Sequence, residues 1–498
     1  MNALRSLPLA VACALSPLAG AETAITVYSS ARPGTLSSQT IRSGGEGGAI
    51  PGYALVKEER AFPLKAGRNV LRVTDVPALI DPTTVSFASL TDPTSTRVVE
   101  QSFEFDLTST AKLLSRYLDR EITVEQSRGN AVEAFTGTLV GTQGGITLRQ
   151  ADGSVRVLEN RAGIRLPSLP GGLISKPTLV WDIDTRTAGS HASRFTYQTA
   201  GMTWWTDYNV TYTEGAGASA CQLDVGAWVT LVNQSGASYA DARLKLIAGD
   251  VQRAQPRYPA APQALAMRAA AADKVEGFAE KAFFEYHLYT LGRATSLPDN
   301  STKQIELFPM AGGANCEKTL VYQGQGAMPY YGSPMLDRAF GVQSNRKVDV
   351  YLRFRNAAAN RLGMPLPAGK VRVSKLDPAD RSLEFIGEDL IDHTARDEMV
   401  QLRLGSAFDV VGERRQVDFR IDTNAKWMEE DIEVKVRNQK PDEAANVVVK
   451  ENLYRWSTWT LLRKSHEFTK EDARTIHFPL RLAPKQEATV RYTVRYTW

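Results

Sequence analysis

The chain has 498 residues, more than one hydrophobic core can hold, and this length predicts three or four domains. Charged residues make up 23% and hydrophobic residues 43%, the balance of an ordinary globular protein. The net charge of +4 comes from 59 basic and 55 acidic residues, which argues against nucleic-acid binding, because such proteins carry a clustered excess of Lys and Arg.

Residues 1–21 have the pattern of a signal peptide, with a basic residue, an apolar run over 7–18 and a small-residue motif ending at Ala21. Cleavage there makes Glu22 the first mature residue. The run is too short to span a bilayer, and no later run of about 18 apolar residues follows. We therefore expect a periplasmic or secreted protein without a transmembrane segment in the mature chain. Lipoprotein anchoring through Cys13 is disfavoured, because too few apolar residues precede it.

Residues 22–107 are rich in short alternating runs and predict an N-terminal β domain. Residues 108–167 predict a small domain with one short helix, capped by Thr108 or Ser109. Four short strands with turns such as Asp152-Gly153 follow and suggest an SH3-like or Sm-like barrel. Residues 168–175 contain Pro and Gly and read as a linker.

Residues 176–498 predict a β-sandwich region of one or two subdomains, because alternating runs recur throughout. An apolar strand ends in Asn233 and a second strand follows after a long turn. The same spacing recurs at Asn438, and a third copy ends at Asn356. This repeat favours stacked antiparallel, immunoglobulin-like sandwiches. Residues 253–281 are rich in Pro and then Ala, and predict a mobile insertion. Alternation over 490–498 predicts a last strand with one buried face.

Removal of the signal peptide leaves two cysteines, Cys221 and Cys316. In an oxidising compartment two cysteines favour a disulfide, and each of these precedes a predicted strand. The alternative is two separate buried thiols, because the distance between their Cα atoms cannot be read from the sequence.

Five ungapped blocks stand out in order along the chain, at residues 171–181, 201–209, 233–250, 387–394 and 404–410. Together they resemble a family of exported bacterial proteins, which shares a C-terminal domain of unknown function with the mucoidy inhibitor A-like proteins. The resemblance covers roughly residues 110–498. It implies an exported, β-rich envelope protein and no particular reaction.

Catalytic motifs are lacking in the sequence. No nucleophile elbow, phosphate-binding loop or dinucleotide fingerprint is present. The densest polar cluster contains Asp389, Asp392 and His393, which are weak metal-ligand candidates, since one His in a charged turn is more often a turn anchor. We therefore expect no metal and no cofactor, and the sequence favours a protein that is not an enzyme.

Aromatic residues are the remaining candidates for ligand contact. Trp204, Trp205 and Tyr208 lie together in one predicted strand, and Tyr330 with Tyr331 sits in a predicted surface loop. Paired tryptophans can stack on sugar rings, but they also fill sandwich cores. Because neighbours in a strand point to opposite faces, at most one of Trp204 and Trp205 should be buried.

These patterns predict an envelope protein with a binding or structural role towards a protein or glycan partner. The alternative is an envelope-polysaccharide hydrolase whose site assembles from distant loops. A third interpretation is an assembly factor that uses residues 253–281 as a helix induced by its partner.

Overall fold

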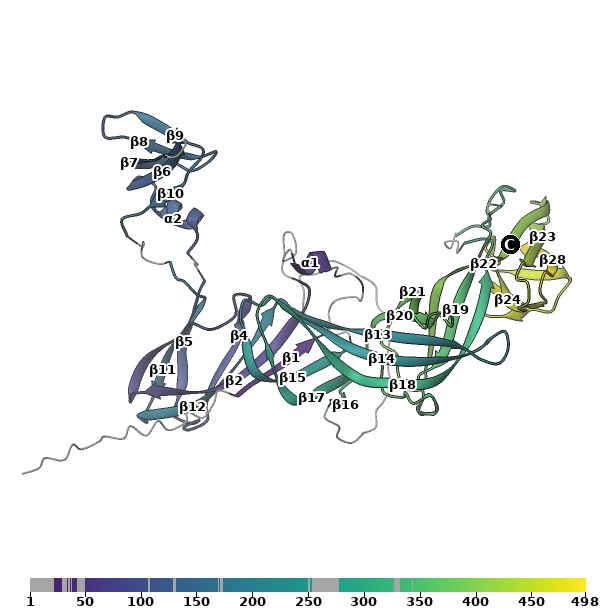
Figure 1. The fold of residues 1–498 in the computed structure, drawn as a ribbon, viewed down its shortest axis with the longest axis horizontal. Coiled ribbons are helices and arrows are strands. Elements are labelled where there is room, and N and C mark those ends of the chain that lie inside the picture. Colours follow the sequence, from purple (N-terminus) through teal and green to yellow (C-terminus); the bar gives the residue numbers. More distant parts are fainter. Residues whose placement is uncertain are drawn as a thin grey trace, which may run out of the picture.

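The computed structural model describes residues 22–28, 34, 36, 38–42, 50–105, 108–128, 131–168, 170, 173–249, 251–252, 277–326, 332–342 and 344–498. The described chain is mainly β, as the sequence predicts, and its strands form four sheets. Figure 1 shows an elongated arrangement, with a small domain at one end and the C-terminal strands at the other.

A seven-stranded sheet joins strands from the two ends of the first 300 residues. Its order is β16 (Phe278–Phe283), β17 (Tyr286–Leu297), β15 (Tyr239–Ala248), β1 (Glu22–Tyr28), β2 (Tyr53–Leu64), β12 (Gly189–Ala200) and β4 (Ile80–Ser89). Strand β1 lies between β2 and β15, antiparallel to β2 and parallel to β15. β1 and β2 precede the predicted domain boundary at residue 107, but they pair with β15 and β12, which follow the boundary at residue 176. Strands of the first 107 residues therefore share a sheet with strands from the region after residue 176.

A three-stranded sheet covers one end of the seven-stranded sheet. Its order is β3 (Gly67–Val73), β11 (Thr178–Thr185) and β5 (Arg97–Glu104). Trp181 of β11 is fully buried, and its ring lies 5.2 Å from that of Phe87 and 5.5 Å from that of Phe195. The two sheets therefore form a sandwich, because aromatic side chains from both inner faces meet in one core.

The small domain is inserted between β5 and β11. It contains helix α2 (Thr110–Arg116) and the sheet β10 (Gly163–Arg165), β6 (Glu121–Arg128), β7 (Ala131–Gly141), β8 (Ile146–Arg149) and β9 (Val155–Leu158). Ser109 caps α2, since its side chain accepts a hydrogen bond from the Lys112 N–H, as the sequence predicts. In the described residues the five strands form an open sheet rather than a closed barrel.

The fourth sheet has thirteen strands and organises the rest of the chain. Its main path is β21 (Leu383–Ile391), β20 (Gly369–Leu376), β13 (Met202–Glu214), β14 (Ala220–Asn233), β18 (Ser301–Tyr322), β19 (Lys347–Arg355), β22 (Met399–Asp422), β23 (Trp427–Asn438), β28 (Glu487–Thr497) and β25 (Trp459–Lys464). Three further strands lie off this path, β24 (Ala445–Asn452), β26 (Thr469–Lys470) and β27 (Thr475–Leu482).

Two long strands link the hydrophobic cores on either side of them. β18 has 22 residues and contributes Leu307 to the first core and Tyr322 to the second. β22 has 24 residues and contributes Leu402 and Phe419 in the same way. Figure 1 shows both strands running from the middle of the molecule towards the C-terminal strands. The two cores are therefore joined by continuous β structure rather than by a linker.

The three predicted Asn positions have one structural role. The side-chain amide of Asn233 donates to the carbonyls of Ala237, Leu297 and Pro298 at 2.9–3.1 Å. Asn438 donates in the same way to the carbonyls of Glu443, Leu482 and Ala483. Asn356 donates to those of Met364 and Ala395. All three are buried, so each satisfies backbone carbonyls that a buried strand end leaves without partners.

Some predictions fall outside the described residues. These include the signal peptide with Cys13 and Ala21, the loop with Tyr330 and Tyr331, and residues 253–276 of the predicted insertion. The end of that insertion is a strand, because β16 begins at Phe278 and pairs with β17. The prediction of a single helix is wrong, since α1 (Ser38–Arg42) and the 3-10 turn η1 (Ala358–Asn360) are also present.

Candidate functional site

The aromatic cluster of β13 divides between the two faces of its sheet. Trp204 is fully buried, with its ring 6.2 Å from that of Tyr289 on the opposite sheet. Tyr208 is also buried and donates from its hydroxyl to the Pro367 carbonyl at 2.7 Å. Burial raises the pKa of this hydroxyl strongly. The prediction that Trp204 and Tyr208 contact a ligand is therefore wrong, because both point into the core.

Trp205 lies on the other face and is half-buried beside a polar pocket. The strand register explains which residues join it. Trp205 pairs with Thr230 of β14, and Thr230 pairs with Gln304 of β18. On the other side of β13, Asp207 pairs with Lys370 of β20. Residues opposite each other in neighbouring strands share a face, so four strands contribute to one row of side chains.

Asp207 is the centre of a hydrogen-bond network in this pocket. Its Oδ2 accepts from the Trp205 indole N–H at 3.0 Å and from the Thr230 hydroxyl at 2.6 Å. Its Oδ1 accepts from Nη1 of Arg372 at 3.0 Å. The Gln304 amide donates to the Thr230 hydroxyl at 3.1 Å, which extends the network to β18. These bonds fix the Trp205 ring and commit both carboxylate oxygens.

Two cations from β20 form the charged side of the pocket. The Arg372 side chain that bonds Asp207 also lies 3.7 Å from the Glu388 carboxylate. Lys370 lies 3.4 Å from the other oxygen of Glu388. Asp207 is buried, whereas the Lys370, Arg372 and Glu388 side chains are 26%, 43% and 45% exposed. The pocket therefore combines a buried anion with charged groups that water and a ligand can reach.

The pocket has a volume of about 500 Å³ and is open to solvent. Gly34, Leu36 and Ile41 from the segment around α1 line one wall, and Thr302 adds a hydroxyl. The side-chain amide of Gln234 donates to the Ile41 carbonyl, which holds this wall against the end of β14. The lining thus offers an aromatic ring, hydroxyl and amide groups and two cations to one small volume.

Sequence reasoning missed most of this site. Thr230, Gln304, Lys370 and Arg372 come from segments up to 165 residues away from Asp207, and none belongs to a recognisable motif. Trp228 was also missed. It lies opposite Asp207 in the β13–β14 pair and is 39% exposed. The one available signal was alternation, since Trp205, Asp207 and Trp228 all occupy positions that face away from the core.

Two of the three weak metal candidates serve as structural anchors. Asp389 accepts a hydrogen bond from the Arg403 N–H at 2.7 Å, and Nδ1 of His393 accepts from the Ala368 N–H at 3.0 Å. The Asp392 side chain is exposed. Within the described ranges, no group of three or more His, Cys, Asp or Glu residues is arranged to hold a metal ion.

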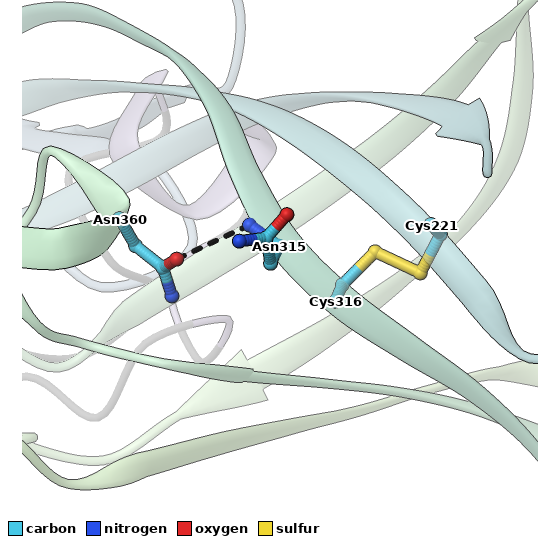
Figure 2. The surroundings of a disulfide bond; sticks show 4 residues. All are labelled: Cys221, Asn315, Cys316 and Asn360. Atoms are coloured by element: carbon cyan, nitrogen blue, oxygen red, sulfur yellow. Dashed lines mark hydrogen bonds between the residues drawn. A yellow bond between two sulfur atoms is a disulfide. The ribbon is translucent and has the colours of Figure 1, made fainter. Parts of the chain in front are cut away.

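The two mature cysteines form a disulfide between neighbouring strands. Cys221 of β14 and Cys316 of β18 are direct register partners, with their Cα atoms 4.9 Å apart. Figure 2 shows the bridge, together with the Asn315 N–H, which donates to the Asn360 side chain of η1. Of the two alternatives left open by the sequence, the structure therefore has the disulfide.

None of the helices in the described part of the chain is both long and apolar enough to cross a membrane. Comparisons with protein-family models, with curated proteins and with solved structures find no match to this chain.

Proposed function

We propose that this chain is an exported cell-envelope protein that binds a glycan partner in the pocket around Trp205 and Asp207. The observation that carries the proposal is the hydrogen bond from the Trp205 indole to Asp207, which fixes an aromatic ring beside a polar, open pocket. Sites for polyhydroxylated ligands combine an aromatic surface with a few fixed polar groups. The signal-peptide pattern and the family resemblance support export.

Binding fits this geometry better than glycoside hydrolysis does. A glycosidase needs one carboxyl group to give up or accept a proton while a second faces it across the substrate. Asp207 already accepts three hydrogen bonds from side chains of the protein, so both of its carboxylate oxygens are engaged in holding the pocket together. Glu388 is held beside Lys370 and Arg372. The hydrolase alternative would therefore need another site.

We infer that the β structure around each of the two hydrophobic cores joined by β18 and β22 is related to immunoglobulin-like sandwiches. We also infer that the small domain with α2 and five strands is related to SH3-like or Sm-like barrels. The support for the first is the repeated buried Asn at a strand end. The support for the second is a capped helix followed by five short strands.

The test is binding of the purified mature protein to a panel of envelope glycans, with product release followed in the same samples. We expect binding without turnover. Trp205→Ala should weaken the affinity by about five- to 150-fold, because loss of a stacked ring costs about 1–3 kcal/mol. Trp205→Phe should keep most of the affinity. Phe284→Ala removes an aromatic side chain that is 84% exposed outside the pocket, and serves as the matched control.

Three results would count against this proposal. Affinity that is equal in Trp205→Ala and the wild type would move the site elsewhere. Release of product would bring the hydrolase forward. Absence of binding to every glycan, in a protein whose thermal unfolding is normal, would leave a protein partner as the function to pursue.

A further inference from the structure

A layer of arginines covers the outer face of four adjacent strands in the C-terminal part of the chain. The strands are β22, β23, β28 and β25, and the arginine layer consists of Arg415, Arg420, Arg463, Arg491 and Arg495. The register places Arg415 and Arg491 on either side of Glu433, and Arg420 and Arg495 on either side of Glu429. The layer is therefore a regular array rather than a chance cluster.

Carboxylates lie beneath these arginines and hold them in place. The Glu433 and Glu429 side chains are only 3% and 6% exposed. Arg415 and Arg491 both contact Glu433, at 2.8 and 2.7 Å, and these hydrogen bonds lower the pKa of Glu433. The arginine side chains themselves are 42–70% exposed. Glu429 and Glu433 are therefore buried below the guanidinium groups, whereas Asp431 and Asp418, which also contact Arg420, are 24% and 45% exposed.

The orientation of each guanidinium leaves one side available. Arg415, Arg491 and Arg495 use Nε and Nη2 to contact the carboxylate beneath them. Arg420 and Arg463 also make their polar contacts through Nε and Nη2. For all five, Nη1 has no hydrogen-bond partner among the residues that the structure describes. The Nη1–Nη2 end of a guanidinium is a planar fork that matches a carboxylate with two hydrogen bonds.

The spacing of the forks suits a repeating anion. Arg415 and Arg491 are two strands apart, which corresponds to about 10 Å across the sheet, and four residues separate Arg491 from Arg495, about 13 Å along the strand. Beside β25, the surface continues into an open groove of about 660 Å³ that includes Arg463, Lys464 and Lys470. The row of exposed cationic side chains thus extends from the flat face into a groove at its edge.

We propose that the arginine layer binds a linear polysaccharide whose sugar units carry carboxylates. The exposed hydroxyl of Thr497 lies on the same face as the arginines of β28, which suits a hydroxyl-rich polymer. An acidic peptide would be expected to add a strand along β25. That edge carries a bulge between Leu461 and Arg463 and two cations, features that oppose strand addition. The proposal is independent of the Trp205 pocket.

The experiment compares polygalacturonic acid with the same polymer after methyl esterification of its carboxylates. Binding to the full mature protein is measured at increasing salt. We expect the acid form to bind, with an affinity that falls as salt rises, and the esterified form not to bind. The decisive variant is Arg415→Lys/Arg491→Lys/Arg495→Lys, which keeps every charge and every neutralised Glu but removes the forks. It should bind about tenfold more weakly or worse.

The control is Arg68→Lys/Arg97→Lys/Arg243→Lys, three arginines with side chains 59–77% exposed on other sheets, which should bind as the wild type does. If the decisive variant unfolds, Arg463→Lys alone gives a smaller test, because Asp431 keeps its contact with Arg420. Equal affinity of folded lysine variants and wild type would overturn the proposal. So would equal binding of the esterified polymer, absence of binding at low salt, or binding confined to polyglutamate or to anionic vesicles.

Discussion

The repeated buried Asn gives the sharpest test of how this fold is held together, and Asn233→Asp is the substitution we would make. The change is nearly isosteric. It keeps the Oδ1 that accepts from the Ser235 N–H, but replaces the amide that donates to the Ala237, Leu297 and Pro298 carbonyls. Asn233 is 2% exposed, so water cannot take over the lost bonds.

The expected magnitude follows from these contacts. The Asn233 amide has two N–H groups for these three carbonyls, and at about 1 kcal/mol for each N–H the loss of its bonds alone costs about 2 kcal/mol. A buried carboxylate facing carbonyl oxygens adds the cost of an uncompensated charge, and such losses reach about 3–5 kcal/mol. For a cooperatively unfolding unit of about 150–250 residues, a loss of about 3–5 kcal/mol should lower the midpoint temperature of unfolding by roughly 6–20 °C.

The assay is thermal unfolding followed by intrinsic fluorescence, with hydrogen exchange reporting on β14 and β15, since a chain with several cores need not unfold in one step. Burial raises the pKa of the new carboxyl in the folded state, so the destabilisation should be full at pH 7 and shrink as pH falls towards about 4, where the unfolded chain is also protonated. The control is Asn424→Asp, in an exposed turn. A midpoint within about 1 °C of this control at pH 7 would refute the reasoning.

Three further predictions test other parts of the chain. Arg455→Met should destabilise the C-terminal core by about 3–5 kcal/mol, because Arg455 pairs with buried Glu430 at 2.7 Å and donates to the carbonyls of Met335 and Asp337. Denaturant titration measures this loss of unfolding free energy, and Arg455→Met/Glu430→Gln should recover part of it. Reduction of the Cys221–Cys316 bridge, which spans 95 residues, should cost up to about 4.7 kcal/mol, and a Cys221→Ser variant that unfolds like the oxidised wild type would contradict this. Hydrogen bonds from Ser95 and Thr187 lower the pKa of Asp92 to about 2. The stability that Asp92 contributes is therefore present above pH 4 and is lost as pH falls through about 2. Hydrogen exchange at residues 92–95 should rise over that range in the wild type but show no such pH dependence in Asp92→Asn.

The sequence predicted those features that depend on local pattern. Alternation predicted that at most one of Trp204 and Trp205 is buried, and the structure confirms this, because Trp204 is fully buried and Trp205 is half-buried on the other face. The Asn233 and Asn438 repeat was visible as spacing, and the structure shows the same three-carbonyl arrangement at both. Such features are readable because side-chain direction in a strand is fixed by its period of two.

Pairing between distant strands was not readable. β1 is parallel to β15, although more than 200 residues separate them in the sequence. The side chains of a strand show which face is buried, but they do not show which other strand lies beside it. The N-terminal third was therefore predicted as a separate domain, while its first strand completes a sheet with β15 and β17. Loop-closure cost rises only slowly with length, so chain distance excludes few partners.

The same limit explains why only a fragment of each candidate site could be predicted. Trp205 was found because an aromatic pair is conspicuous, but its Asp207 partner gains meaning only when β20 brings Arg372 beside it. Arg491 and Arg495 were visible as alternate residues of the last strand, yet the sequence assigns no role to an exposed Arg. The role that we propose depends on β23, which places Glu433 and Glu429 beside them, because these buried carboxylates hold the Arg491 and Arg495 guanidinium groups in place. In both sites the chemistry belongs to a row across several strands, whereas a sequence displays only one strand at a time.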